Sequence, residues 1–593
     1  MSKKLTTIEK IKLIQNYLIQ NKLDGFIQPR ADSYLGEYVP KYDARLEWIS
    51  GFTGSAGVIL ILRKQAILFV DSRYTIQAKN ETKNTGIKVI LSAQQSLEKY
   101  ILLNAKKFKE IGYDPWLHSY SYIKSIINLS IKYKVNFKPL KSNPIDIFWS
   151  NDRNISPNSD INVHPLKYAG ISANKKIKNL CMYLKKLNTE AYIINQPDSL
   201  AWLLNIRGMD LKHTPIILSR AIIFNNGYIY LFIDSSRINK KIKNHFNNNI
   251  KIFPEKNIIS EIIKISKKKN KILIDPDSVS YALIHFIKDK KNNLIETKCP
   301  IEKMKAIKNA IEIKGAFSAH LKDGVALSKF LYWIHKSKIT NNSELLASNT
   351  IDNLRSKQRN FICTSFETIS GFSSNGAIVH YRVTKKSNKK FSNNNLFLCD
   401  SGGQYLEGTT DVTRTVAIGK PTKNMKNHFT IVLKGHIALA SAIFPYGTTG
   451  NDLDLLARLP LWKNNMNYGH GTGHGVGSCL SVHEGPHRIS KGSFIPLEPG
   501  MITSNEPGFY LTNKYGIRIE NLMLVKKNKN MLAFETLTLA PIDINLVNYN
   551  LLTKEEINWL NNYHNNVYKS ISSKLDKQNK DWLKKVCAPY LKR

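Results

Sequence analysis

The ten residues from Tyr468 to Gly477 constrain this chain more than any other stretch, because every second one of them is glycine. Glycine lets the backbone approach a neighbour or a ligand closely, and this density of it is not typical of an ordinary helix or strand. His470 and His474 lie inside the run and His483 follows it, so three imidazoles fall within fourteen residues. Taken alone, the run also fits a flexible surface loop, so its interpretation depends on the polar residues around it.

Length and charge limit the class of protein. A chain of 593 residues is too long for one hydrophobic core and predicts two to four domains. The net charge of +42 would usually indicate nucleic acid or an anionic membrane. Here the lysines are spread along the whole chain among isoleucine and asparagine, and they form no arginine-rich stripe with interleaved aromatic residues. We therefore predict neither a nucleic-acid partner nor a membrane partner.

Cysteine usage predicts the compartment. The six cysteines lie far apart and form no C-x-x-C pair, which favours reduced thiols in a cytoplasmic protein. Residues 5–20 have the pattern of an amphipathic helix rather than of a signal peptide. The longest apolar runs are far shorter than a membrane span.

The first half of the chain has the alternating pattern of an α/β fold. Strands are predicted at residues 25–28, 58–62 and 66–70, with helices between them. Part of this pattern returns, because residues 189–199 resemble residues 23–33 and each segment follows an amphipathic helix. We therefore predict two similar α/β domains.

Three domains follow from this reading. The α/β domains are predicted at residues 1–155 and 156–300, and Asn226-Gly227 predicts a hairpin turn in the second. A third domain, residues 301–593, begins with a long helical region and carries nearly all the unusual polar residues. Its last part, residues 552–593, is predicted to be a helical tail that packs on that domain.

Two acids border apolar segments of the third domain. Asp400 ends an apolar strand at a glycine turn, and Asp411 opens a strand with alternating pattern that runs to Ile418. If the two strands form a hairpin, the carboxylates face each other, and each raises the pKa of the other unless a cation holds them. The alternative is a pair of solvated turn acids. The segment 385–395 is rich in lysine and asparagine, which predicts a loose entry into the hairpin.

Two more acids complete a candidate metal site. Glu506 precedes a Pro-Gly turn, and Glu520 shares one face of the predicted strand 516–525 with Arg518. Four carboxylates and one histidine of the glycine run carry more negative charge than one divalent ion needs, which favours two metals with bridging carboxylates. Oxygen ligands with a single nitrogen favour Mn²⁺, with Co²⁺, Fe²⁺ and Zn²⁺ as alternatives, and the set contains no cysteine for a thiolate zinc site.

The order Asp400, Asp411, His474, Glu506, Glu520 resembles the metallopeptidases of the pita-bread fold, which include methionine aminopeptidase, prolidase and aminopeptidase P. Within that group the chain resembles the three-domain Xaa-Pro aminopeptidases over nearly its full length. The segments that carry the resemblance are residues 43–57, 375–381, 468–477, 483–486 and 534–541. The resemblance implies two creatinase-like α/β domains followed by a pita-bread catalytic domain, and a homodimer.

The resemblance also implies metal ligands. Asp400 would hold one divalent ion, His474 and Glu506 would hold the other, and Asp411 and Glu520 would bridge the two ions. A hydroxide between the ions would then attack the bond between the first residue of a peptide and a following proline, while Glu506 transfers the proton.

Further residues are implied to contact the substrate. His380 and His483 match histidines near the scissile carbonyl, and His470 matches the wall of the pocket for the proline ring. Arg518 matches a supporting arginine. With these roles filled, we expect the glycine run to be ordered and buried.

Two other functions stay open at this point. A prolidase would use the same ligands on Xaa-Pro dipeptides, but prolidases generally have one N-terminal module rather than two. A pita-bread protein without catalytic activity would be a binding module, yet such proteins lose ligands, and this sequence has all five.

Overall fold

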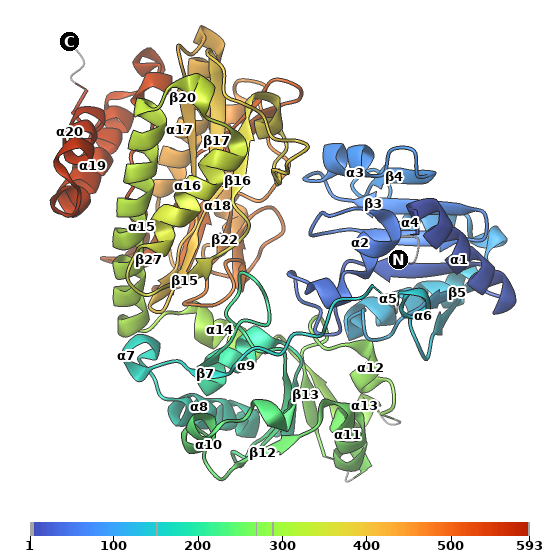
Figure 1. The fold of residues 1–593 in the computed structure, drawn as a ribbon. Helices are drawn as coiled ribbons and strands as arrows, with labels where there is room; N and C mark the ends of the chain where they lie inside the picture. Colours follow the sequence, from blue (N-terminus) through green and yellow to red (C-terminus); the bar gives the residue numbers. More distant parts are fainter. Residues whose placement is uncertain (1–4, 150–151, 268–269, 288–289, 591–593) are drawn as a thin grey trace. The chain divides into compact units, whose positions relative to one another are not determined.

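The computed structural model describes residues 5–149, 152–267, 270–287 and 290–590. The chain forms two compact units (Figure 1). Unit 1 comprises Met1–Val163, Ser172–Lys212 and Ile216–Ile301, and unit 2 comprises His164–Ile171, His213–Pro215 and Glu302–Arg593. Among the described residues, no helix is both long enough and apolar enough to cross a membrane.

Unit 1 begins with a six-stranded sheet in the order β4-β3-β2-β1-β5-β6. The predicted strands at 25–28, 58–62 and 66–70 are present as β1, β2 and β3. The first helix, α1, starts at a capping box between Thr6 and Glu9 and buries one apolar stripe against the sheet. The strands are β1 (Gly25–Pro29), β2 (Val58–Leu62), β3 (Gln65–Val70), β4 (Ile87–Leu91), β5 (Glu110–Tyr113) and β6 (Asn136–Pro139), and the helices are α1 (Thr7–Gln20), α2 (Arg45–Ser50), α3 (Thr75–Glu81), α4 (Leu97–Leu103), α5 (Tyr120–Tyr133) and α6 (Pro144–Phe148).

A second sheet in unit 1 has the order β12-β11-β10-β8-β13-β14. Its strands are β8 (Ala191–Ile194), β10 (Arg220–Phe224), β11 (Ile229–Phe232), β12 (Ile250–Phe253), β13 (Ile272–Ile274) and β14 (Leu294–Glu296), and its helices are α8 (Ala173–Lys186), α9 (Pro197–Leu204), α10 (Lys240–His245), α11 (Ile258–Lys267), α12 (Tyr281–Ile284) and α13 (Lys290–Asn293). Two short strands, β7 (Asn162–Val163) before this sheet in the chain and β9 (Ile206–Arg207) between β8 and β10, form a separate antiparallel pair. The hairpin predicted at Asn226-Gly227 joins β10 to β11.

The two sheets are copies of one topology. Strand β1 pairs antiparallel with β2 and parallel with β5, and β8 pairs in the same way with β10 and β13. At one edge of each sheet the outer pair is parallel, β3 with β4 and β11 with β12. The likeness extends to a buried lysine on the preceding helix, because Nζ of Lys10 donates to the carbonyl of Trp48 and Nζ of Lys176 to that of Trp202, each over 2.9 Å. The predicted duplication is therefore confirmed, whereas the boundaries at residues 155 and 300 stay predictions.

In unit 2, helices pack around antiparallel sheets of two to six strands (Figure 1). Its helices are α7 (Leu166–Ala169), α14 (Pro300–Ala306), α15 (Ala310–Lys336), α16 (Glu344–Ser356), α17 (Lys423–Ala440), α18 (Gly450–Trp462), α19 (Lys554–Ile571) and α20 (Lys577–Val586). The sheets are β15 (Phe361–Thr364), β18 (Gly403–Tyr405) and β19 (Gly408–Thr409); β16 (Ile369–Phe372), β17 (Asn395–Ser401) and β20 (Val412–Ile418); β25 (Gly508–Leu511) and β26 (Tyr515–Arg518); and a six-stranded sheet of β21 (Ile443–Phe444), β28 (Met531–Thr536), β27 (Asn521–Asn528), β24 (Ile502–Asn505), β22 (Gly473–Gly475) and β23 (Glu484–Ile489).

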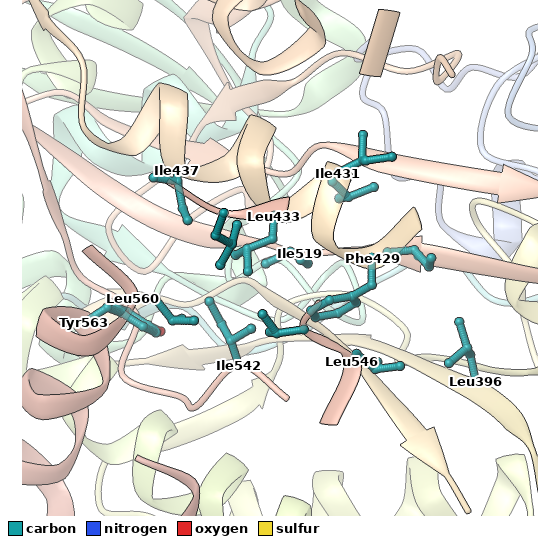
Figure 2. Close-up of a cluster of buried hydrophobic side chains, with 14 of the residues drawn as sticks. Leu396, Phe429, Ile431, Leu433, Ile437, Ile519, Ile542, Leu546, Leu560 and Tyr563 are labelled. Carbon is teal, nitrogen blue, oxygen red and sulfur yellow. The ribbon is translucent and has the colours of Figure 1, made fainter. Parts of the chain in front are cut away.

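A large hydrophobic core lies between α17, the strands and the C-terminal tail. Phe429 and Leu433 of α17 belong to it together with Leu560 and Tyr563 of α19 (Figure 2). The tail helix α20 contributes Leu583 to the same cluster. The C-terminal helices are therefore part of this core, and the metal-site strands are built on it.

Three local expectations need correction. Strands β17 and β20 pair, but β18 and β19 lie between them in the chain, so Asp400 stands opposite Thr413 rather than Asp411. The pattern of β20 is not alternating in burial, because both faces of the strand are covered over most of its length. The segment 385–395 is anchored near its middle rather than loose there, since the backbone N–H of Lys389 donates to Glu344 over 2.8 Å.

Candidate metal centre

Three carboxylates meet where β17 ends and β20 begins. Asp400 is on β17, Asp411 directly precedes β20, and Glu520 lies between β26 and β27. One oxygen from each lies within 4.8 Å of one from each of the other two, and all three residues are buried. The excursion through β18 and β19 thus brings Asp411 to Asp400 without the simple hairpin that the sequence pattern predicted.

His474 faces the same group of acids. Its Nε2 atom lies 3.5 Å from Oδ2 of Asp411 and 3.5 Å from Oε1 of Glu506. Its Nδ1 atom lies 2.9 Å from the carbonyl of Gly475. Because a carbonyl only accepts, Nδ1 carries the proton and Nε2 presents a lone pair to the carboxylates. This is the tautomer that a metal-binding imidazole needs.

Glycines place His474 between two strands. A Cβ atom on Gly473 would lie 2.1 Å from the carbonyl oxygen of Ser504 on β24, and one on Gly475 would lie 2.3 Å from that of Glu484 on β23. The run therefore contains a short strand, β22, which the glycine content argued against. Tyr468 and most residues from Thr472 onward are buried, while Gly469 and Gly471 are exposed, so the expected burial holds for part of the run only.

The electrostatics of these acids favour a cation. Burial and the neighbouring carboxylates hold the pKa of Asp411 and that of Glu520 well above the ordinary range. Burial also raises the pKa of Glu506 to about 7. Oδ1 of Asp400 and Oδ1 of Asp411 are buried without a hydrogen-bond partner in the described part of the chain. Four oxygen donors and one nitrogen, with two oxygens unsatisfied, fit divalent metal ions.

Arg518 connects this centre to the glycine run. Its Nη2 donates to Oδ2 of Asp400 over 2.6 Å, and its Nη1 donates to the hydroxyl of Tyr510 over 2.6 Å. That hydroxyl lies 2.9 Å from Nε2 of His470. Because Nδ1 of His470 must donate to the carbonyl of Gly471, 2.8 Å away, Nε2 accepts the proton of Tyr510.

Tyr510 is the residue that sequence reasoning missed. It lies on β25, which pairs with β26, the strand of Arg518. The available signal was the short polar turn 512–514 between two apolar segments, which is typical of a hairpin.

The remaining predicted residues lie around the same centre. The ring centroid of His483 is 4.4 Å from that of His474, with the two rings nearly perpendicular. One possible ligand atom from each of Asp411, His474 and His483 lies within 4.8 Å of those of the other two. His380 follows Val379, whose carbonyl lies 3.4 Å from Nη1 of Arg518.

Fold and site together define a class, the hydrolases in which a carboxylate-rich metal centre lies within a domain of helices and antiparallel sheets. The sequence matches metallopeptidase family M24 over residues 317–527 and the C-terminal region of peptidase M24 over residues 530–590. It also matches the creatinase/prolidase N-terminal domain twice, over residues 10–142 and 152–312. The predicted fold class, two creatinase-like domains followed by an M24 domain, is confirmed.

Individual relatives agree with this assignment. A probable Xaa-Pro aminopeptidase P of Talaromyces marneffei is 36% identical, over 98% of this chain and 92% of its own. The X-prolyl aminopeptidase of Caenorhabditis elegans, described as a cytosolic enzyme with a di-nuclear active site, superposes with a TM-score of 0.94 at 33% identity, over 99% of this chain and 100% of its own. A prolidase of Thermococcus sibiricus, 25% identical with a TM-score of 0.50, covers 63% of this chain and 98% of its own. The chain belongs to the Xaa-Pro aminopeptidase family of M24 metallopeptidases.

Proposed function

We propose that this enzyme hydrolyses the bond between the N-terminal residue of a peptide and a proline in second position. The observation that carries the proposal is the convergence of Asp400, Asp411, His474, Glu506 and Glu520 in one largely buried centre, with Nδ1 of His474 directed at the carbonyl of Gly475. The doubled α/β module supports an aminopeptidase over a prolidase, because the X-prolyl aminopeptidase of Caenorhabditis elegans covers 99% of this chain and the prolidase of Thermococcus sibiricus covers 63%.

The ligands support two divalent ions. In the proposed arrangement Asp400 would hold one ion, His474 and Glu506 would hold the other, and Asp411 and Glu520 would contribute to both. Hard oxygen donors with one imidazole favour Mn²⁺. When bound, two such ions lower the pKa of a shared water so that hydroxide is available near neutral pH.

Side chains of the centre then handle the protons. Glu506 accepts a proton from the attacking water and transfers it to the proline nitrogen. The C–N bond then breaks, the peptide that begins with proline leaves, and the first residue is released as a free amino acid. The side-chain hydroxyl of Ser504 donates a hydrogen bond to Oε1 of Glu506 over 3.2 Å and orients this carboxylate. His483 and His380 donate hydrogen bonds to the carbonyl oxygen as negative charge develops on it.

Selectivity for proline has a physical basis. The bond before proline is a tertiary amide without an N–H group, so an enzyme cannot grip that group and needs a pocket for the ring instead. His470 is proposed as one wall of this pocket, since Tyr510 fixes its ring over 2.9 Å. Arg518 supports both Asp400 and Tyr510.

One assay tests the activity. Purified protein is incubated with Mn²⁺ and either an Xaa-Pro dipeptide or an Xaa-Pro-Xaa tripeptide, and release of the first residue is measured. We expect hydrolysis of the tripeptide, and loss of at least about 100-fold in kcat/KM for His474→Ala and Glu506→Ala. Activity on the dipeptide alone would establish a prolidase instead. Equal rates in wild type and variants would refute the proposed site.

A homodimer is proposed from an exposed apolar face of α18. Leu455, Leu459 and Trp462 share this face at helical spacing and are 47%, 42% and 47% exposed. Sedimentation velocity of Leu459→Glu should show a monomer where wild type is a dimer. An unchanged sedimentation coefficient would place the interface elsewhere.

Two further assignments complete the proposal. We propose a cytoplasmic location, supported by six cysteines that lie far apart and form no C-x-x-C pair, and by the cytosolic description of the Caenorhabditis elegans relative. We also propose the division into domains at residues 1–155, 156–300 and 301–593, which the duplicated topology supports.

A further inference from the structure

A fully buried carboxylate holds the loop that carries His380. Glu344 opens helix α16 directly after the N-cap residue Ser343, and its side chain turns into the protein. Among the described residues, the donors to this carboxylate come from residues 372–389, the segment that surrounds His380. The donors are the backbone N–H of Phe372 at 2.7 Å, Nδ2 of Asn375 at 3.0 and 3.1 Å, the hydroxyl of Tyr381 at 3.0 Å and the backbone N–H of Lys389 at 2.8 Å.

These donors lie on both sides of His380. Asn375 precedes the histidine, Tyr381 follows it directly, and Lys389 closes the loop. Nδ2 of Asn375 also lies 2.9 Å from the hydroxyl of Tyr381, and both groups contact the carbonyl of Ser387. The carboxylate therefore joins the two arms of the loop, which fixes the backbone on either side of His380.

All the donors are neutral groups, so no cationic side chain contributes to these bonds. A buried carboxylate needs such donors to offset its lost hydration. Glutamine has the same shape, but its amide presents two N–H donors toward N–H and O–H groups that also donate. Glu344→Gln thus disrupts the clamp with little change in side-chain volume.

The opposite side of the loop is seated on the catalytic strand. A Cβ atom on Gly516 of β26 would lie 1.8 Å from the carbonyl oxygen of Gly376, so the two backbones are in direct contact. Farther along, the carbonyl of Val379 lies 3.4 Å from Nη1 of Arg518, the residue that binds Asp400. The loop is therefore held between Glu344 and the strand of Arg518, with His380 between the two anchors.

We propose that Glu344 is a positioning residue for catalysis, which acts by holding His380 in the orientation required for the substrate carbonyl. This inference rests on the proposed function, in which His380 donates a hydrogen bond to that carbonyl. Glu344 itself does not touch substrate. Its effect must therefore be transmitted through His380, and that dependence can be measured.

A double-mutant cycle tests the transmission. We expect Glu344→Gln to lower kcat for an Xaa-Pro-Xaa peptide by roughly 10- to 100-fold, because a displacement near 1 Å costs about that much, with a smaller change in KM. In a His380→Ala background the same change should lower kcat by less than about 3-fold, since the group that it positions is gone. Equal losses in both backgrounds would overturn the proposal.

A control variant accounts for lost stability. Asp114 in unit 1 is also a buried carboxylate that accepts from a backbone N–H, that of Trp116, and from the side-chain amide of Asn143, each at 3.0 Å. Asp114→Asn should reduce the melting temperature as Glu344→Gln does, yet leave kcat within about 2-fold of wild type. If both variants lower kcat alike, Glu344 has only a structural role and the proposal fails.

A second readout does not depend on catalysis. Amide hydrogen exchange of Phe372 and Lys389 should accelerate in Glu344→Gln while exchange in β17 stays unchanged. If Glu344→Gln does not fold, Tyr381→Phe removes one donor and should give a smaller loss of kcat that again disappears in the His380→Ala background. Unchanged exchange and an unchanged kcat would each overturn the proposal.

The two levels of failure can be separated. A wild-type protein without activity on Xaa-Pro peptides would refute the proposed function itself. An active wild type with fully active Glu344→Gln would refute only the role of Glu344. An active wild type with fully active His380→Ala would refute the proposed role of His380, and with it that of Glu344, while the proposed reaction would stand.

Discussion

The glycine at position 473 offers the sharpest test of how the metal centre is built. In Gly473→Ala the new Cβ atom would lie 2.1 Å from the backbone carbonyl oxygen of Ser504, whereas real Cβ contacts of this kind are not closer than 3.0 Å. Strand β22 must therefore move by about 1 Å, because a backbone carbonyl in a sheet cannot rotate away. His474 is the next residue and moves with it.

The consequence for the centre follows from distances. Metal–ligand bonds tolerate deviations of about 0.2 Å, so a shift near 1 Å removes His474 from the coordination sphere. We expect Gly473→Ala to lower metal affinity and to reduce kcat/KM by about 100-fold or more, with a loss of stability of about 1–3 kcal/mol from overpacking. Metal content by mass spectrometry and tripeptide hydrolysis measure the two effects.

The same run contains the matched control. A Cβ atom on Gly471 would find its nearest neighbour at 3.4 Å, an ordinary contact. Gly471→Ala should therefore keep activity within about 3-fold of wild type. If Gly473→Ala binds metal and turns over substrate like wild type, close backbone packing does not position His474, and our account of the glycine run is wrong.

Three further predictions concern charge. Arg518→Lys keeps the positive charge, but one ammonium cannot bind both Asp400 and Tyr510, so we expect tripeptide kcat/KM to fall by at least about 10-fold. Full activity would contradict the proposal that the guanidinium holds both residues. Chelation of the metals should lower the melting temperature, since ions at 100 times their Kd contribute about 3 kcal/mol, and an unchanged melting curve would argue against bound metal. Burial raises the pKa of Asp32 from 3.8 to about 6. Folding therefore favours its protonated form, and this stabilisation is present below pH 4 and lost as the pH rises through 6. Relative to wild type, Asp32→Asn should gain roughly 3 kcal/mol in urea unfolding between pH 4 and pH 8, and a pH-independent difference would contradict this.

Local patterns predicted much of unit 1. The apolar segments at 58–62 and 66–70 are strands because short continuous apolar runs, rich in β-branched and other large apolar residues, are separated by a short turn. The repeated segment around residues 23–33 and 189–199 was enough to predict a duplicated module. The shared strand order confirms this prediction, and the buried lysines Lys10 and Lys176 occupy equivalent positions in the two copies.

For the centre, the sequence by itself determined which chemical groups are present and in which order: four acids and one imidazole beside glycine and apolar segments. Tertiary structure decided how they meet. Asp400 reaches Asp411 through the excursion of β18 and β19, and Tyr510 joins Arg518 to His470, contacts that no local pattern contains. The clamp of Glu344 on residues 372–389 is of the same kind, since its partners lie 28 to 45 residues away. Periodicity and turn chemistry act over a few residues, whereas burial and hydrogen bonding are satisfied only when distant segments pack together.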